Sequence, residues 1–165
     1  MLRKVIKMLH EMGAIGVLGS FATCIVLIAK VPTHSMVQYA AVRQSIAAIS
    51  QWLLVPSLAV VLVSGLLGIA ATDAYKDAGW VWVKALLGIS MFEGTLVTVG
   101  ASARQAAQLS AQAALAPGDA TQTAGQLAQV LHTEWGGLWL LLLLSVANII
   151  LAVWRPRLWS ARRVE

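Results

Sequence analysis

The chain has 165 residues, of which 59% are hydrophobic and 12% are charged, and its mean hydropathy is +0.77. A soluble domain is roughly 45–50% apolar and about 25% charged, so this composition excludes an ordinary soluble domain and also a disordered chain. The single cysteine, Cys24, excludes a disulfide within one chain and a cysteine-based zinc or iron–sulfur site. We therefore predict one integral membrane domain, residues 1–165, in a lipid bilayer, with Cys24 as a reduced structural cysteine.

Four stretches are apolar and long enough to cross a bilayer core as helices, which takes roughly 20 residues for a core of about 30 Å. They cover about residues 8–29, 46–71, 80–103 and 135–154. The first is expected to be retained, because its apolar run is longer than that of a cleaved signal peptide. The sequence thus predicts an all-α fold, a four-transmembrane-helix bundle. Pro56, inside the second span, is expected to kink that helix.

The basic residues predict the orientation of the spans. Nine of the twelve lysines and arginines lie on the side that holds both termini. These nine are Arg3, Lys4, Lys7, Lys76, Lys84, Arg155, Arg157, Arg162 and Arg163. Because basic residues accumulate on the cytoplasmic side, both termini are predicted to be cytoplasmic. The net charge of +5 is then explained without a nucleic-acid partner.

The second external segment, residues 104–133, differs in composition from the spans. It is rich in alanine and glutamine and is interrupted at Pro117 and Gly118. Apolar residues recur at helical spacing on both sides of this break. We therefore expect two short amphipathic helices on the outer surface, covering the bundle or contacting a partner.

Small residues form faces on three of the spans. They are Gly13, Gly16, Gly19 and Ser20 in the first, Ser64, Gly65 and Gly68 in the second, and Gly88, Ser90, Gly94 and Gly100 in the third. Such faces let helix backbones approach closely in lipid. The alternative is that they leave room for a flat ligand.

Ionisable residues within a membrane are costly, so the few that occur there are candidate functional residues. Glu93 lies 13 residues beyond Trp80, or roughly 20 Å along a helix, in the outer half of the membrane. Its carboxyl group must face the bundle, pair with a cation or stay protonated. It is a candidate for proton transfer, cation binding or substrate contact, or else a neutral hydrogen-bonding group. Glu11 and Lys84 are closer to the inner interface.

Three histidines are the candidate metal ligands: His10 at the inner end of the first span, and His34 and His132 on the outer side. An imidazole can bind haem iron or copper, or move protons. The alternative for His10 is a structural side chain at the interface. Because His10 has no histidine partner on the cytoplasmic side, a haem there would take its second ligand from Met8, Met12 or a second chain. On the outer side, His34 and His132 could form a pair.

Motifs in the first three spans resemble those of a known group. The first span begins with Lys7–Gly13 (KMLHEMG), the second carries Leu54–Pro56 followed by Ser64–Leu66, and the third opens with Gly79–Lys84 (GWVWVK). Over about residues 4–100 the chain resembles small bacterial four-helix membrane proteins: the CopD-like copper proteins, the HemJ-type protoporphyrinogen oxidases and their uncharacterised relatives. The resemblance implies the bacterial cytoplasmic (inner) membrane and a redox or metal-linked role. In that role His10 would contact haem or metal, and Lys84 would be a companion residue.

The chain contains no glycine-rich phosphate loop, no credible Ser–His–Asp arrangement and no paired acidic motif, so hydrolase and kinase chemistry are not predicted. The expected function is a redox role linked to haem b or copper. One alternative is a non-catalytic subunit of a larger respiratory-type membrane complex, or a homo-oligomer. Another is a small ion or metal carrier that uses Glu93. Whether the protein is an enzyme stays open.

Overall fold

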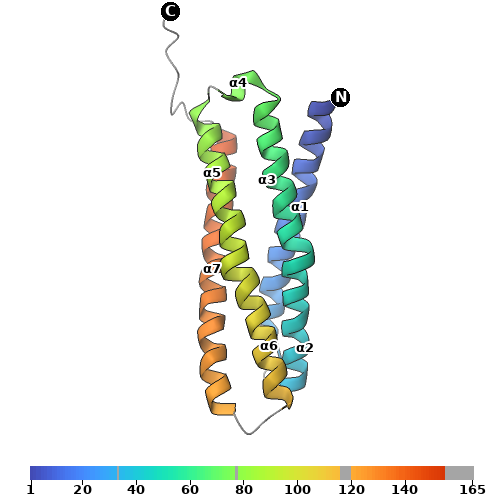
Figure 1. The fold of residues 1–165 in the computed structure, drawn as a ribbon, viewed down its shortest axis with the longest axis vertical. Coiled ribbons are helices and arrows are strands. Elements are labelled where there is room, and N and C mark those ends of the chain that lie inside the picture. Colours follow the sequence, from blue (N-terminus) through green and yellow to red (C-terminus); the bar gives the residue numbers. More distant parts are fainter. Residues whose placement is uncertain (33, 77, 116–119, 155–165) are drawn as a thin grey trace, which may run out of the picture.

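The computed structural model describes residues 1–32, 34–76, 78–115 and 120–154. The helices in these ranges are α1 (Leu2–Ala29), α2 (Met36–Ile49), α3 (Val55–Ala70), α4 (Asp73–Lys76), α5 (Gly79–Gly94), α6 (Ala101–Leu115) and α7 (Ala120–Trp154). The π-helical turn η1 (Ser50–Leu54) joins α2 to α3, and a second, η2 (Thr95–Gly100), joins α5 to α6. The predicted all-α four-helix bundle is confirmed (Figure 1). Pro117, Gly118 and the basic residues after Trp154 lie outside the described ranges.

Four helical rods are apolar and long enough to cross a membrane: Leu2–Ala29, Met36–Ala70, Gly79–Leu115 and Thr123–Trp154. The protein is thus a multi-pass membrane protein. The last three rods have 35, 37 and 32 residues. At about 1.5 Å per residue they are roughly 50 Å long, whereas the hydrocarbon core of a bilayer is about 30 Å thick. The bundle therefore extends well beyond the hydrocarbon at one or both ends.

The two ends of the bundle are named here by their helices. At the α4 end α1 begins, α4 joins α3 to α5, and α7 ends; at the α6 end α2 begins, and α6 ends near the start of α7 (Figure 1). The halves of the bundle next to these ends are called the α4 half and the α6 half.

Residues 104–115 and 120–133 are helical, as predicted, but their helices continue the membrane rods instead of lying separately on the surface (Figure 1). The buried face of α6 consists of small residues: Ser102, Ala103, Ala106, Ala107 and Ser110. Such side chains let α6 pack closely along α2 and α7, which are its main neighbours. The segment between the first two predicted spans, residues 30–45, is also partly helical, because α2 begins at Met36 and is capped by Ser35, whose hydroxyl accepts a hydrogen bond from the Gln38 N–H.

In the α4 half, the glycine face of α1 serves close packing against α3. A Cβ atom added to Gly13 would lie 2.8 Å from Val61 Cγ2 and 3.0 Å from the Ser57 carbonyl oxygen. Gly16 also faces Ser57. Protein atoms fill this contact, so there is no room for a flat ligand at Gly13 and Gly16. Gly19, by contrast, points into open space.

The two π-helical turns have different local causes. Pro56 follows η1, and proline lacks the N–H that would bond the carbonyl four residues earlier, where its ring also crowds the backbone. The helix widens before it, and the Val55 N–H bonds the Ser50 carbonyl, five residues back. The disturbance predicted at Pro56 is therefore a π-helical turn. In η2, the hydroxyls of Thr95 and Thr98 donate to the carbonyls four residues earlier, a bond that tends to bend helices.

One apolar core connects all four rods. Its buried members are Val17, Phe21, Cys24, Ile28, Ile46, Leu54, Leu58, Met91, Val99, Ala103, Leu138 and Leu141. Cys24 is free and buried. Many other large apolar side chains are exposed on the outside of the bundle. That surface is the one a bilayer would cover.

Candidate functional site

The most deeply buried charges among the described residues are Arg43 of α2 and Glu134 of α7. A guanidinium nitrogen of Arg43 lies 2.5 Å from a Glu134 carboxylate oxygen, and each side chain is only 1% exposed. The two residues are 91 positions apart in the chain. Sequence analysis placed both outside the spans and missed the pair. The only available signal was that each precedes an apolar run by a few residues.

Further polar atoms are buried in the same α6 half. Arg43 Nε, the second carboxylate oxygen of Glu134 and Ser50 Oγ have no hydrogen-bond partner within the described ranges. Ser50 belongs to η1 and faces η2, since a Cβ atom added to Gly100 would lie 3.8 Å from Ser50 Oγ. Hydrogen-bonding capacity thus remains free inside the bundle where the two π-helical turns meet.

A second polar contact lies in the α4 half, around His10 of α1. Its Nδ1 is 3.0 Å from the Val61 carbonyl oxygen and 3.1 Å from Ser64 Oγ, both on α3. The Ser64 hydroxyl donates to the Val60 carbonyl, 2.5 Å away. Because a carbonyl can only accept, Nδ1 is assigned as the protonated nitrogen of the neutral ring, and Nε2 then carries the lone pair.

Gly65 and Lys84 complete the surroundings of His10. The imidazole lies against Gly65, where an added Cβ atom would be 3.5 Å from His10 Cε1. Lys84 of α5 is half-buried and lies one helical turn before Gly88, where an added Cβ atom would be 3.6 Å from Leu62 of α3. The structure therefore brings His10 and Lys84, the two residues singled out by the family resemblance, into one region of the α4 half.

Glu93 and Glu11 lie apart from these clusters. Glu93 is exposed on the outside of α5, and in the described part of the chain its carboxyl group has no ion pair. It is 14 residues beyond Gly79, about 21 Å along the helix, on a surface that lipid would cover. Glu11 is also exposed and pairs with Lys7, with 3.7 Å between the charged groups.

The three histidines do not form one site. His34 is exposed in the loop before α2, and His132 is exposed on α7. Within the described ranges, no group of three or more His, Cys, Asp or Glu residues could hold a metal ion. Each candidate histidine must therefore be considered as a single ligand.

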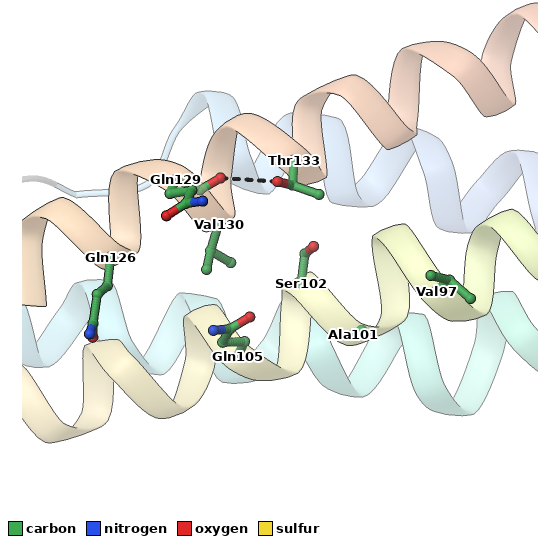
Figure 2. A pocket seen from close by; sticks show the side chains of 8 residues that line it. All are labelled: Val97, Ala101, Ser102, Gln105, Gln126, Gln129, Val130 and Thr133. Atoms are coloured by element: carbon green, nitrogen blue, oxygen red, sulfur yellow. Dashed lines mark hydrogen bonds between the residues drawn. The ribbon is translucent and has the colours of Figure 1, made fainter.

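A cavity of about 520 Å³ lies in the α6 half, between α7 and the rod formed by η2 and α6 (Figure 2). Its lining is mainly polar but uncharged. The residues are Val97, Ala101, Ser102, Gln105, Gln126, Gln129, Val130 and Thr133. Sequence analysis noted the glutamines of this segment as a compositional feature, but it did not place them across a common cavity.

Comparison with known proteins assigns neither a family nor a function to the chain. No family model, no curated protein and no solved structure matches the chain.

Proposed function

We propose that the protein is a redox protein of the bacterial cytoplasmic membrane, with both termini in the cytoplasm, in which His10 would bind the iron of haem b. The observation that supports this most directly is the hydrogen bond from His10 Nδ1 to the Val61 carbonyl oxygen, 3.0 Å away. Metal-bound histidines commonly donate their other ring N–H to a backbone carbonyl, which fixes the tautomer and makes the free nitrogen a better donor. The contact between His10 Nδ1 and the Val61 carbonyl oxygen is of this kind.

The residues around His10 are more consistent with one histidine bound to haem iron than with a copper site. Copper sites take several histidine, cysteine or methionine ligands, and no three His, Cys, Asp or Glu residues gather in the described ranges. Met8 and Met12 are 53% and 61% exposed, and both are two residues from His10, so they lie on the opposite side of α1. Neither is placed to share an iron with His10.

Lys84 is the residue of this chain best placed to accompany His10. It is half-buried on α5, one helical turn before Gly88, which faces Leu62 of α3. Its cationic form would balance the propionate charge of a haem, and its neutral amine would be a second ligand. Bound haem iron would supply one-electron chemistry. Within the protein, the Val61 carbonyl would orient His10 and tune its basicity.

An absorption spectrum of the detergent-purified protein tests this proposal. We expect a Soret band that is lost in His10→Ala. The variants His34→Ala and His132→Ala are matched controls, because both histidines are exposed and distant in sequence from His10, and their spectra should retain the band. A colourless, metal-free wild-type protein would reject the redox proposal. A band unaffected by His10→Ala would reject His10 as the ligand.

A second candidate function depends on Glu93. A charged side chain at the centre of a membrane helix costs about 3 kcal/mol, so exposed intramembrane carboxyl groups normally have a partner. Glu93 is exposed and unpaired within the described residues. This exposure favours a subunit of a larger membrane assembly, or a homo-oligomer, in which another chain covers Glu93.

Native-mass analysis of gently solubilised membranes tests the subunit role. Glu93→Leu should release the partner, whereas Glu93→Gln should keep it because an amide still forms hydrogen bonds. Glu11→Leu is the control, since it removes an exposed carboxylate near a helix end. A stable monomer of wild-type protein would contradict the subunit role. The carrier alternative predicts liposome flux that falls in Glu93→Gln, and unchanged flux would reject it.

A further inference from the structure

The cavity in the α6 half has a defined polar lining on both of its walls. Gln126, Gln129, Val130 and Thr133 of α7 face the residues of η2 and α6 (Figure 2). Its volume, about 520 Å³, falls within the range of small-molecule sites, which is about 300–1,000 Å³. The cavity is therefore large enough for a ligand head group and not only for water.

The lining favours an uncharged, hydrogen-bonding ligand. It contains three side-chain amides, of Gln105, Gln126 and Gln129, and no charged side chain. All three glutamines are exposed, so their amides are open to a ligand. The Thr133 hydroxyl donates to the backbone carbonyl of Gln129, 3.1 Å away, which leaves the lone pairs of the hydroxyl oxygen for a ligand. Amides both donate and accept, so they suit hydroxyl and carbonyl oxygens, whereas a phosphate or carboxylate would find no counter-charge here.

One end of the cavity lies beside an apolar surface. Val97, which lines the cavity, is 71% exposed. On α7, the positions that follow Thr133 on the same face are Gly136 and Leu140. A Cβ atom on Gly136 would meet nothing within 4 Å, and Leu140 is 52% exposed. Exposed apolar positions therefore continue from the polar cavity along the outside of the bundle.

We propose that this cavity binds the head group of an uncharged amphiphile, with the apolar tail lying along Val97, Gly136 and Leu140. The head group offers hydroxyl or carbonyl oxygens to the amides of Gln105, Gln126 and Gln129. Two kinds of membrane molecule share this chemistry: a glycolipid with a neutral sugar, and a quinone or quinol. The site is independent of His10, which lies in the α4 half.

Native mass spectrometry of the full-length protein in detergent tests the proposal with two probes, a monoglucosyl diacylglycerol and a decyl-substituted ubiquinone. We expect one of them to bind, and the double variant Gln105→Leu/Gln129→Leu to weaken that binding at least tenfold. Gly136→Leu should weaken it as well, by blocking the path of the tail. The matched control is Gln108→Leu, because Gln108 is exposed on α6 and does not line the cavity.

Each outcome supports or overturns the site. Binding of the glucolipid identifies a sugar head group, and binding of the ubiquinone identifies a quinone. The proposal is overturned if neither probe binds more tightly than phosphatidylglycerol, whose head group is anionic. It is also overturned if Gln108→Leu weakens binding as much as the double variant does. All substituted side chains lie outside the buried core, so the variants are expected to fold.

Discussion

The α4 half and the α6 half of the bundle are held together by different interactions. In the α4 half, α1 and α3 approach closely through glycine, as at Gly13, and the main polar contact between them is the one made by His10. In the α6 half, the core contains the Arg43–Glu134 ion pair. The two π-helical turns lie near the middle of their rods, and a polar cavity that is open to the outside lies between α7 and the rod formed by η2 and α6.

This difference follows from what surrounds each part of a helix. In lipid there is no hydrophobic force between helices, so close packing of small residues is the main source of stability. Polar side chains are tolerated only where they pair with other protein groups between the rods or where the rods extend into water. The α6 half, where α2, α6 and α7 continue the rods, contains most of the buried polar side chains, including Arg43, Ser50, Ser110 and Glu134. Specific pairing of charges therefore supplements packing at that end.

The largest expected effect concerns the buried ion pair. Arg43→Met or Glu134→Leu alone leaves an uncompensated buried charge, which should lower the free energy of unfolding by about 3–5 kcal/mol. The double variant Arg43→Met/Glu134→Leu removes both charges and should be less destabilised than either single variant. Unfolding in mixed detergent micelles, followed by circular dichroism, measures all three.

The exposed Lys7–Glu11 pair is the control for the ion-pair experiment, because its side chains are 78% and 64% exposed. Lys7→Ala should change the stability by no more than about 0.5 kcal/mol. If the double variant is the least stable of the three, the Arg43–Glu134 pair is a net source of stability. The α6 half would then be stabilised mainly by this ion pair and less by packing.

A smaller effect is expected at the glycine contact in the α4 half. Gly13→Leu would place side-chain atoms against Val61 and the backbone of Ser57, and overpacking of this kind costs about 1–3 kcal/mol. Gly19→Leu is the matched control, because an added Cβ atom there meets nothing within 4 Å. Thermal unfolding in detergent should separate the two. Equal effects of both substitutions would show that α1 and α3 are not held by this contact.

The smallest effect concerns α4, which belongs to neither packing region. Lys76 donates a hydrogen bond of 2.6 Å to Asp73, and this contact lowers the pKa of the Asp73 carboxyl group. Because the pKa of Asp73 is lower in the folded protein, the Asp73–Lys76 contact stabilises the fold at pH values above the ordinary pKa of aspartate. This stabilisation is lost as the pH falls through the lowered pKa of Asp73. Asp73→Asn should therefore reduce the Tm slightly at neutral pH.

The effect of Asp73→Asn should disappear in acid and in 1 M salt, because Asp73 is fully exposed and surface pairs are screened. Differential scanning fluorimetry at several pH values measures it. A difference in Tm that persists in acid would assign the loss to the helix itself and not to the charge.

The fold could be predicted from the sequence because each membrane span is a local property of one apolar run. The polar contacts could not, because they join residues that are far apart in the chain. Arg43 and Glu134 meet across 91 positions, and His10 meets Val61 across 51. Residues such as Arg43 also lie in segments that composition assigns to loops. Their helices are stabilised by the neighbouring rods and not by their own hydrophobicity.

The π-helical turns have a consequence for sequence alignment. Each turn contains one residue more than the α-helical path would need, and one residue rotates the following helix face by about 100°. A relative with an uninterrupted α-helix would therefore align with this chain only through a single-residue gap within Ser50–Leu54 or Thr95–Gly100. Such a gap inside a membrane span would be a genuine structural difference and not an alignment error. Helical-wheel diagrams for this chain should accordingly be restarted at each of these turns.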